Sequence, residues 1–304
     1  MTRIDIYGTD KWAEIPSSWD EMTPAQIRFV FKTYDECLRK GASPLDFNIR
    51  VLYHLLGIRR RTPAWKIAPE SPLCENIYML CERCLGFLFT DSGAGSADGA
   101  TAGSSTRRLT LSCKRLDNPL PTLRVSPFRV LHGPGTLCQD LTFGEFRQAS
   151  AALNQFFKTS DVSELDDCIR HLYRPWSFRT NRAGRCVRPI GSDGSLREIK
   201  AIARVPMWQK NLILVWFSSC LDYLQKEKVI VDGDEIDMHL LFSGEGKSGK
   251  TEAFTWTDLL VQIAREGTIG TMAEVDREPL FSIFSIMWSN YKENKRYEKA
   301  SKTK

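Results

Sequence analysis

The residue string with the clearest chemical potential is Gly244-Glu245-Gly246-Lys247-Ser248-Gly249-Lys250-Thr251, which satisfies the G-x-x-x-x-G-K-[ST] pattern of a phosphate-binding loop. In such a loop the backbone amides and the lysine bind nucleotide phosphates, and the threonine hydroxyl binds magnesium. The preceding residues 238–242 are apolar enough to form a strand. Taken by itself, the string indicates a nucleotide-hydrolysing enzyme.

The surroundings of the string oppose that interpretation. A phosphate-binding loop lies within a core of parallel strands, whereas the flanking residues have helical patterns. Magnesium also needs a carboxylate at the end of a buried strand, and no apolar strand after Thr251 ends in Asp or Glu. The helical pattern begins only at Phe254, beyond the motif. We therefore interpret the match of Gly244, Gly249 and Lys250 with Thr251 as chance, and we expect an exposed connector and no cofactor.

A basic stretch, residues 168–210, is the second candidate site, with ten Lys and Arg against Asp193 and Glu198. Trp176 and Phe178 lie among the arginines, a combination that suits nucleic acid because arginine binds phosphates and aromatic rings stack on bases. The alternative is a solvated segment whose arginines pair with acidic helices or an acidic partner. We favour this alternative because the chain has no signature of a nucleic-acid-binding module. The candidate contact residues are Arg174, Arg179, Arg182, Arg185 and Arg188.

The cysteines and histidines do not form a recognisable metal or catalytic pattern. Cys81 and Cys84 form a C-x-x-C, but a zinc site needs two more ligands at a suitable spacing, and the four histidines are isolated. Cysteines in the helical pattern of residues 73–89 behave as small hydrophobic residues, so we expect buried thiols and no metal. Because the chain also has neither G-x-S-x-G nor H-E-x-x-H, we expect no catalytic residues and no enzyme.

The composition is that of an ordinary globular protein, with 304 residues, 42% hydrophobic and 26% charged. No run of about 18 apolar residues predicts a membrane span. Residues 1–10 lack the apolar region of a signal peptide. We therefore expect a cytoplasmic protein without a membrane partner.

Helix-start signals recur along the chain. Thr23-Pro24-Ala25-Gln26 combines a capping threonine, a proline at the first helical position and a glutamine that reaches back to the cap. Ser43-Pro44 and Ser71-Pro72 repeat part of this device, and Thr142 with Glu145 forms another capping box. Together with apolar residues spaced three and four apart, these signals predict helices over residues 24–38, 48–56, 73–89, 142–158, 161–173, 206–224, 254–265 and 279–291.

Little strand structure is expected. Residues 108–113 alternate as a strand does, residues 120–125 are a candidate partner, and residues 176–204 have an irregular pattern. The fold class we predict is mainly α, with two helical subdomains and a short β-hairpin insertion between them. The predicted parts are a helical domain (1–90), a flexible low-complexity loop (91–106), a short β segment (107–135), a second helical domain (136–291) and a charged tail (292–304).

Five further segments have a familiar arrangement. They are Pro16-Ser17-Ser18-Trp19-Asp20-Glu21-Met22-Thr23 with Gln26, Gly133-Pro134 with Leu141-Thr142-Phe143-Gly144-Glu145-Phe146, Leu165 to Pro175 with its end Leu172-Tyr173-Arg174-Pro175, Val205-Pro206 through Phe217 to Cys220, and Phe254-Thr255-Trp256 through Ile263-Ala264 and Gly267 to Gly270. Together they resemble tail-module proteins, similar to tail-assembly chaperones, of phages and prophages of gut Bacteroidetes. The chain departs from that pattern at Asp166, where Asn is usual, and at Ser219, where Gly is usual.

The resemblance implies a non-enzymatic tail-assembly protein that binds tail tube or tape-measure protein in the bacterial host. Its helices would offer an apolar groove to an amphipathic helix of the partner, with Trp176, Phe178 and Trp256 as candidate contacts. One alternative is a structural virion component, such as a tail-completion or connector protein. The other is nucleic-acid binding through residues 168–210.

Overall fold

A computed structural model of the chain describes residues 1–5, 12–57, 72–90, 110–188, 195–231, 233–242 and 256–302. Most of these residues are helical, and the strands form small antiparallel sheets, which confirms the predicted mainly α class. The chain forms two compact units: unit 1 is Met1–Arg115 with Pro206–Trp216, and unit 2 is Leu116–Val205 with Phe217–Lys304. The phosphate-loop string and the low-complexity loop at 91–106 lie outside the described residues.

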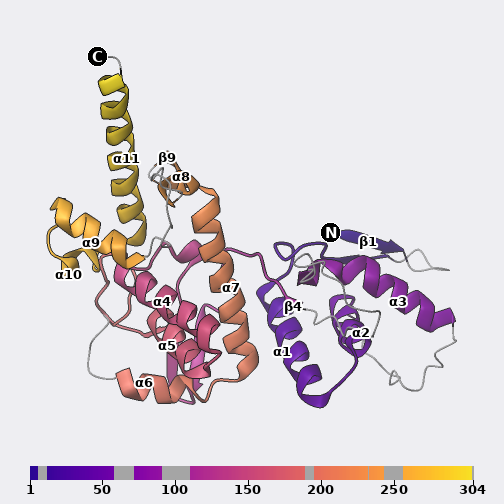
Figure 1. The fold of residues 1–304 in the computed structure, drawn as a ribbon. Coiled ribbons are helices and arrows are strands. Elements are labelled where there is room, and N and C mark those ends of the chain that lie inside the picture. Colours follow the sequence, from indigo (N-terminus) through magenta and orange to yellow (C-terminus); the bar gives the residue numbers. More distant parts are fainter. Residues whose placement is uncertain are drawn as a thin grey trace. The chain divides into compact units, whose positions relative to one another are not determined.

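Unit 1 begins with a hairpin, continues with three helices and contains one further pair of short strands (Figure 1). Each hairpin is antiparallel, β1 with β2 and β3 with β4. The elements are β1 (Thr2–Asp5), β2 (Trp12–Ile15), α1 (Pro24–Lys40), α2 (Pro44–Leu55), α3 (Pro72–Leu85), a 3-10 turn (Gly86–Leu88), β3 (Phe89–Thr90) and β4 (Thr110–Leu111).

The start of α1 follows the predicted capping box. The Thr23 hydroxyl accepts a hydrogen bond from the Gln26 backbone amide (3.3 Å), and the Thr23 amide donates to the Gln26 side chain (2.8 Å). The helix ends at Gly41, which has a φ of 60°, in the left-handed region that glycine adopts without strain. Around Trp19, aromatic side chains form the core of unit 1, with ring centroids 6.1 Å from Phe31 and 6.0 Å from Phe87.

Unit 2 consists of helices and two small sheets. Its helices are α4 (Phe143–Thr159), α5 (Val162–Leu172), α6 (Ser195–Ile202), the end of α7 (Met207–Lys226), α8 (Met238–Phe242), α9 (Trp256–Glu266), α10 (Met272–Val275) and α11 (Leu280–Lys302), with a 3-10 turn at Thr136–Cys138. The strands are β5 (Thr122–Ser126), β6 (Arg129–His132), β7 (Arg174–Pro175), β8 (Lys228–Val231) and β9 (Asp234–Asp237).

A helical hairpin of α4 and α5 forms the centre of unit 2 (Figure 1). The Phe146 ring packs edge-on against Phe217 of α7 (6.0 Å between centroids) and Trp256 of α9 (4.9 Å). The sheet β5-β6-β7 is antiparallel, with Leu123 opposite Leu131 and both side chains fully buried. The C-terminal part of α11 extends away from the rest of unit 2.

The strand pairing differs from the prediction. Residues 120–125 do not pair with residues 110–113, the described part of the predicted partner strand, because β5 pairs with β6 and β4 pairs with β3. A two-residue connection, Pro127-Phe128, lets β5 and β6 close locally, whereas the predicted pairing would have needed a longer connection.

Three local predictions were also wrong. Residues 238–242 form helix α8 rather than a strand, since Asp237 accepts a hydrogen bond from the Leu240 amide (3.2 Å) and thereby caps the helix. Helix α6 lies within residues 176–204, which were expected to be irregular. Helix α11 continues to Lys302, beyond the predicted end at residue 291. No described helix is long and apolar enough to cross a membrane.

Candidate functional site

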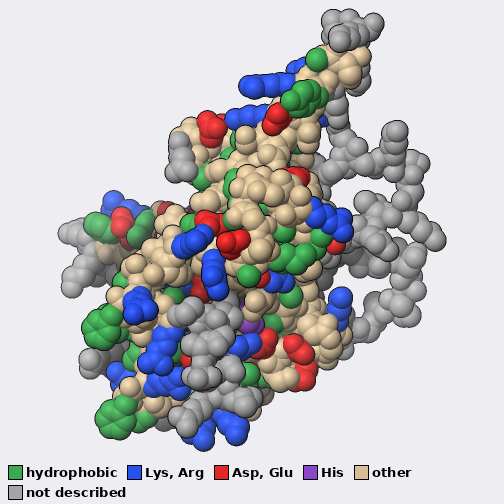
Figure 2. All heavy atoms as spheres, turned by 90° about the vertical axis from the view of Figure 1, so that its left-hand side faces the viewer, with side chains coloured by type: hydrophobic (Ala, Val, Ile, Leu, Met, Phe, Trp, Pro, Cys, Tyr) green, Lys and Arg blue, Asp and Glu red, His purple; other side chains and the backbone are tan. Residues whose placement is uncertain are grey.

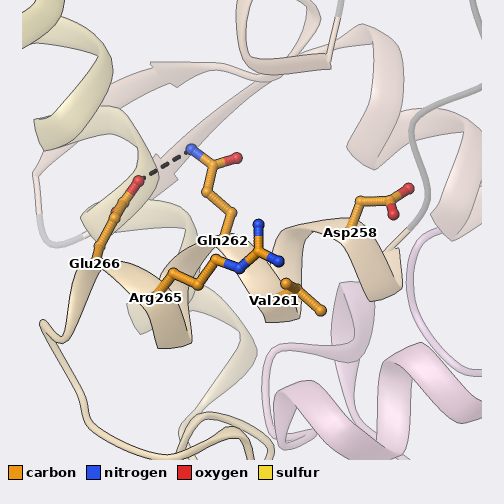
Figure 3. A pocket seen from close by; sticks show the side chains of 5 residues that line it. All are labelled: Asp258, Val261, Gln262, Arg265 and Glu266. Atoms are coloured by element: carbon orange, nitrogen blue, oxygen red, sulfur yellow. Dashed lines mark hydrogen bonds between the residues drawn. The ribbon is translucent and has the colours of Figure 1, made fainter.

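A shallow depression of about 580 Å³ runs along α9 (Figure 3). The described residues that line it are Asp258, Val261, Gln262, Arg265 and Glu266, and their spacing places them on one helical face. Gln262 Nε2 donates a hydrogen bond to Glu266 (3.0 Å), whose other oxygen accepts one from Asn290 (2.6 Å). This lining is polar and mixed in charge, unlike the apolar groove expected for a partner helix.

The described lining of this depression does not amount to a catalytic constellation. All five side chains come from α9, and they include no Ser, Cys or His that would act as a nucleophile or base. In the part of the chain that the structure describes, no cluster of His, Cys, Asp and Glu has the geometry of a metal site.

The candidate arginines divide into internal and external groups. Arg185 is internal and only 6% exposed. Its guanidinium donates to the backbone oxygens of His132 (2.7 Å) and Leu172 (2.9 Å) and pairs with Asp140 (3.7 Å) and Glu145 (4.0 Å). Burial raises the pKa of the Glu145 carboxyl, and the charge of Arg185 opposes that shift. Arg185 therefore stabilises the fold around the start of α4.

Arg174 is the second internal arginine, with 2% of its surface exposed. It donates to the backbone oxygen of Arg188 (3.2 Å) and pairs with Glu198 of α6 (3.4 Å), which also pairs with Arg129 of β6 (3.4 Å). Burial lowers the pKa of the Arg174 guanidinium, and the negative charge of Glu198 opposes this. Two of the five candidate contact residues are thus enclosed within unit 2.

The other three candidate arginines are exposed. Arg182 forms an ion pair with Glu278, whereas the side chains of Arg179 and Arg188 form no ion pair with any described residue. Arg124 of β5 is likewise exposed and without such a partner among the described residues. The interpretation that the arginines pair with acidic residues of this chain therefore fits Arg174, Arg182 and Arg185. It does not account for Arg124, Arg179 and Arg188, which pair with no carboxylate among the described residues.

Exposed aromatic side chains flank the sheet β5-β6-β7. Trp176 is 46% exposed and Phe178 91%, with ring centroids 4.2 Å apart and the rings nearly perpendicular. Phe128, in the connection between β5 and β6, is fully exposed. The third aromatic contact candidate, Trp256, differs because its ring packs against Phe146 in the core.

Strand register places two of these side chains, Arg124 and Trp176, in one row across the sheet. Arg124 is opposite Val130, and Leu131 is opposite Pro175, so one further step along β6 places Trp176 beside Val130. Trp176 in turn pairs with Val187. Directly opposed residues of neighbouring strands have Cα atoms about 4.5–5.5 Å apart. We call the exposed set the aromatic–arginine surface, and define it as Arg124, Phe128, Trp176, Phe178, Arg179 and Arg188.

A space-filling view shows the same kind of grouping. In the lower left of Figure 2, Lys and Arg side chains gather beside projecting hydrophobic rings. Positive charge next to exposed rings is a combination that binds anionic partners with flat or apolar groups.

The chain matches no protein-family model, no curated protein and no solved structure.

Two members of the aromatic–arginine surface, Arg124 and Phe128, lie outside residues 168–210 and were missed by the sequence analysis. Pro127 marks a turn between two short strands, and Arg124, Phe128 and Arg129 lie close to it in the sequence. This turn is the signal from which Arg124 and Phe128 could have been predicted to be exposed. Their closeness to Trp176 depends on the pairing of β6 with β7, which joins residues more than 40 positions apart.

The cysteines of the C-x-x-C are buried, as predicted. Cys81 is 2% exposed and Cys84 4% exposed in α3. Burial raises the pKa of the Cys81 thiol to about 12, so this group stays protonated at neutral pH. A protonated and enclosed thiol is suited to packing rather than to nucleophilic chemistry.

Proposed function

We propose that this protein is a non-enzymatic phage or prophage tail-assembly protein, which binds tail tube or tape-measure protein before assembly. The proposal rests on the resemblance in sequence, and on one structural observation that favours a binding role. At the connection between α4 and α5, Phe157 is 60% exposed and Val162 is 41% exposed. Large apolar side chains at a helical end are suited to contact a partner protein.

The chemistry of this end of the hairpin fits an amphipathic helix as the partner. Phe157 lies in the last turn of α4, Val162 begins α5, and the half-buried Phe156 ring lies 5.8 Å from that of Phe157. Since α4 and α5 are anchored by the core beneath them, the apolar end is held in place without a partner. Covering an apolar stripe of the tape-measure protein here would keep that protein from aggregating.

Co-expression with the tail tube and tape-measure proteins of the same phage or prophage tests this proposal. We expect the partner to be more soluble with the protein than without it, and to co-purify with it. Phe157→Asp should reduce recovery of the complex at least about 10-fold, because a carboxylate would be buried in an apolar contact. Asn154→Asp, an equal change of charge at an exposed position of α4, is the matched control.

Mass spectrometry of purified particles addresses the alternative of a structural virion component. An assembly chaperone is absent from mature particles, whereas a tail-completion or connector protein is present in fixed copy number. Recovery of the protein in mature particles, together with the lack of any soluble complex, would overturn the proposed role.

A further inference from the structure

We propose that the aromatic–arginine surface of unit 2 binds single-stranded nucleic acid. In this arrangement Arg124, Arg179 and Arg188 contact phosphates, while Phe128, Trp176 and Phe178 stack on bases. This goes beyond the proposed tail-assembly role, and it involves different residues from the α4–α5 end.

The first argument is the charge that remains after internal pairing. Residues 118–139 and 168–192, the two stretches of sequence that contain β5, β6 and β7, have eight arginines and no Asp or Glu. Carboxylates from elsewhere in the chain pair with five of these arginines, namely Arg129, Arg170, Arg174, Arg182 and Arg185. The remaining three, Arg124, Arg179 and Arg188, are exposed and have no ion-pair partner among the described residues. A polyanion would supply the missing negative charge.

The second argument is the placement of two of these arginines along the sheet. Arg124 lies on β5, and the Arg188 amide donates to the Pro175 oxygen of β7 (3.0 Å). Arg179 directly follows Phe178, and its amide donates to the Ser177 hydroxyl (3.2 Å). Neighbouring strands are about 4.8 Å apart. Arg124 on β5 and Arg188 beside β7 are therefore separated by β6 rather than gathered at one point. A chain of phosphates fits such a spread better than a single small anion does.

The third argument concerns the aromatic side chains and the strandedness of the ligand. Phe178 and Phe128 are almost wholly exposed, so their rings are accessible for stacking. Bases of a single strand present their faces to such rings, whereas a duplex hides those faces within its own stack. An acidic protein segment would satisfy the arginines but would not need stacking rings. The joint presence of both groups therefore favours single-stranded nucleic acid over an acidic protein.

Fluorescence anisotropy with the full-length protein tests the proposal. The probes are labelled 20-nucleotide oligo(dT) and oligo(rU), and a 20-base-pair duplex, at several KCl concentrations. We expect binding of at least one single strand, weaker binding of the duplex, and a slope of log K against log salt of about −2 from three phosphate contacts. The two single strands distinguish DNA from RNA, and binding of either supports the proposal.

Two sets of variants separate the roles of charge and stacking. Replacing Arg124, Arg179 and Arg188 together by Ala should weaken binding at least about 10-fold and reduce the salt slope towards zero. Phe128→Ala with Phe178→Ala should also weaken binding about 10-fold, but should leave the slope unchanged. The control replaces Lys158, Arg265 and Arg277 by Ala, which removes the same number of charges from other exposed positions of unit 2 and should preserve binding.

Two results would contradict the proposal, and they can be told apart. Equal weakening in the control and the arginine variant would show non-specific attraction to a basic protein and overturn the proposal. Displacement of the oligonucleotide by poly-L-glutamate at equal charge, without any effect of the phenylalanine variants, would assign the surface to an acidic protein instead. Because all substituted residues are exposed, unchanged circular dichroism and melting temperature will verify that each variant is folded.

Discussion

Arg185 shows how a residue from a basic stretch can serve the interior of the protein. Its guanidinium reaches two backbone oxygens and two carboxylates, and these four groups come from different parts of unit 2. Its neighbours in sequence, Arg182 and Arg188, are exposed. The type of residue and the local charge count therefore do not decide which arginines form a surface, because burial depends on the packing of distant segments.

We predict that Arg185→Met lowers the free energy of unfolding by about 3–5 kcal/mol. The substitution removes the cation that pairs with the buried Glu145 carboxylate, and it leaves the His132 and Leu172 oxygens without this donor. Urea unfolding followed by circular dichroism measures the effect. Arg179→Met, at an exposed position, should change stability by no more than about 0.5 kcal/mol, and similar effects of the two substitutions would contradict the internal role.

Asp167 makes the free energy of unfolding depend on pH in the acidic range. Its hydrogen bond with His171, followed by that with Arg170, lowers the pKa from the ordinary value of 3.8 to about 2, although burial acts in the opposite direction. A lowered carboxyl pKa in the folded state stabilises the protein above pH 3.8, and this contribution is lost as the pH falls towards 2. Since a third of the side chain is exposed, solvent screening reduces the contribution to about 1 kcal/mol.

Asp167→Asn should therefore be less stable than the native protein at pH 7, and the difference should vanish between pH 4 and pH 2. Urea unfolding at pH 7, 4 and 2.5 gives the comparison. A difference of constant size across this range would show that the effect of the substitution has another cause than ionisation.

At the scale of elements, helices with a local start signal were predicted well. Thr23 with Gln26 and Thr142 with Glu145 form the expected capping boxes, and α1 and α4 begin where those residues indicate. Such signals are readable because all partners lie within four residues of one another. The apolar spacing that follows each box then determines which face of the helix is buried.

Elements that depend on distant partners were not predictable in the same way. The start of α4 is held by the segment before α11, as the Gly144 amide donates to the Asp276 oxygen (2.9 Å) and the Phe143 amide to the Glu278 oxygen (2.8 Å). These contacts join residues more than 130 positions apart. The aromatic–arginine surface has the same origin, since Phe128 directly precedes β6, Trp176 directly follows β7, and β6 pairs with β7. No local pattern in the sequence contains this information.

The close contact at Gly144 leads to a prediction for α4. A Cβ atom at this position would lie 2.9 Å from both the Cβ and the backbone oxygen of Asp276. Gly144→Ala should thus lower the free energy of unfolding by about 1–3 kcal/mol, because α4 or the segment at Asp276 must move. Gly86→Ala is the control, since a Cβ there meets no atom within 4 Å. Chemical denaturation of both variants measures the difference, and equal stabilities would contradict the contact.

At the scale of the whole molecule, charge is distributed unevenly. The formal net charge is only +5, yet eight arginines occur without any carboxylate in residues 118–139 and 168–192. The fold brings carboxylates from outside these segments to most of these arginines, including Glu198 and Glu278. The arginines without a paired carboxylate form a small positive surface beside exposed aromatic rings. The net charge of the whole protein does not indicate that such a surface exists.

The cysteines provide a test of the fold that extends over both units. Among the eight cysteines whose burial the structure describes, only Cys186 is exposed, and the other seven are buried. Burial raises the pKa of the Cys168 thiol and, well above its ordinary value, that of Cys138, which further protects them from alkylation.

We predict that N-ethylmaleimide labels Cys186 in the native protein at least about 100-fold faster than the seven buried cysteines, which react only when the structure opens. Peptide mapping by mass spectrometry at successive times gives the rate at each site. Cys186→Ser should remove the fast reaction at this site, and urea should make the seven others reactive. Rapid native labelling of Cys138, Cys168 or Cys220 would show that the core of unit 2 is more open than the packing described above, whereas rapid labelling of Cys81 or Cys84 would show the same for unit 1.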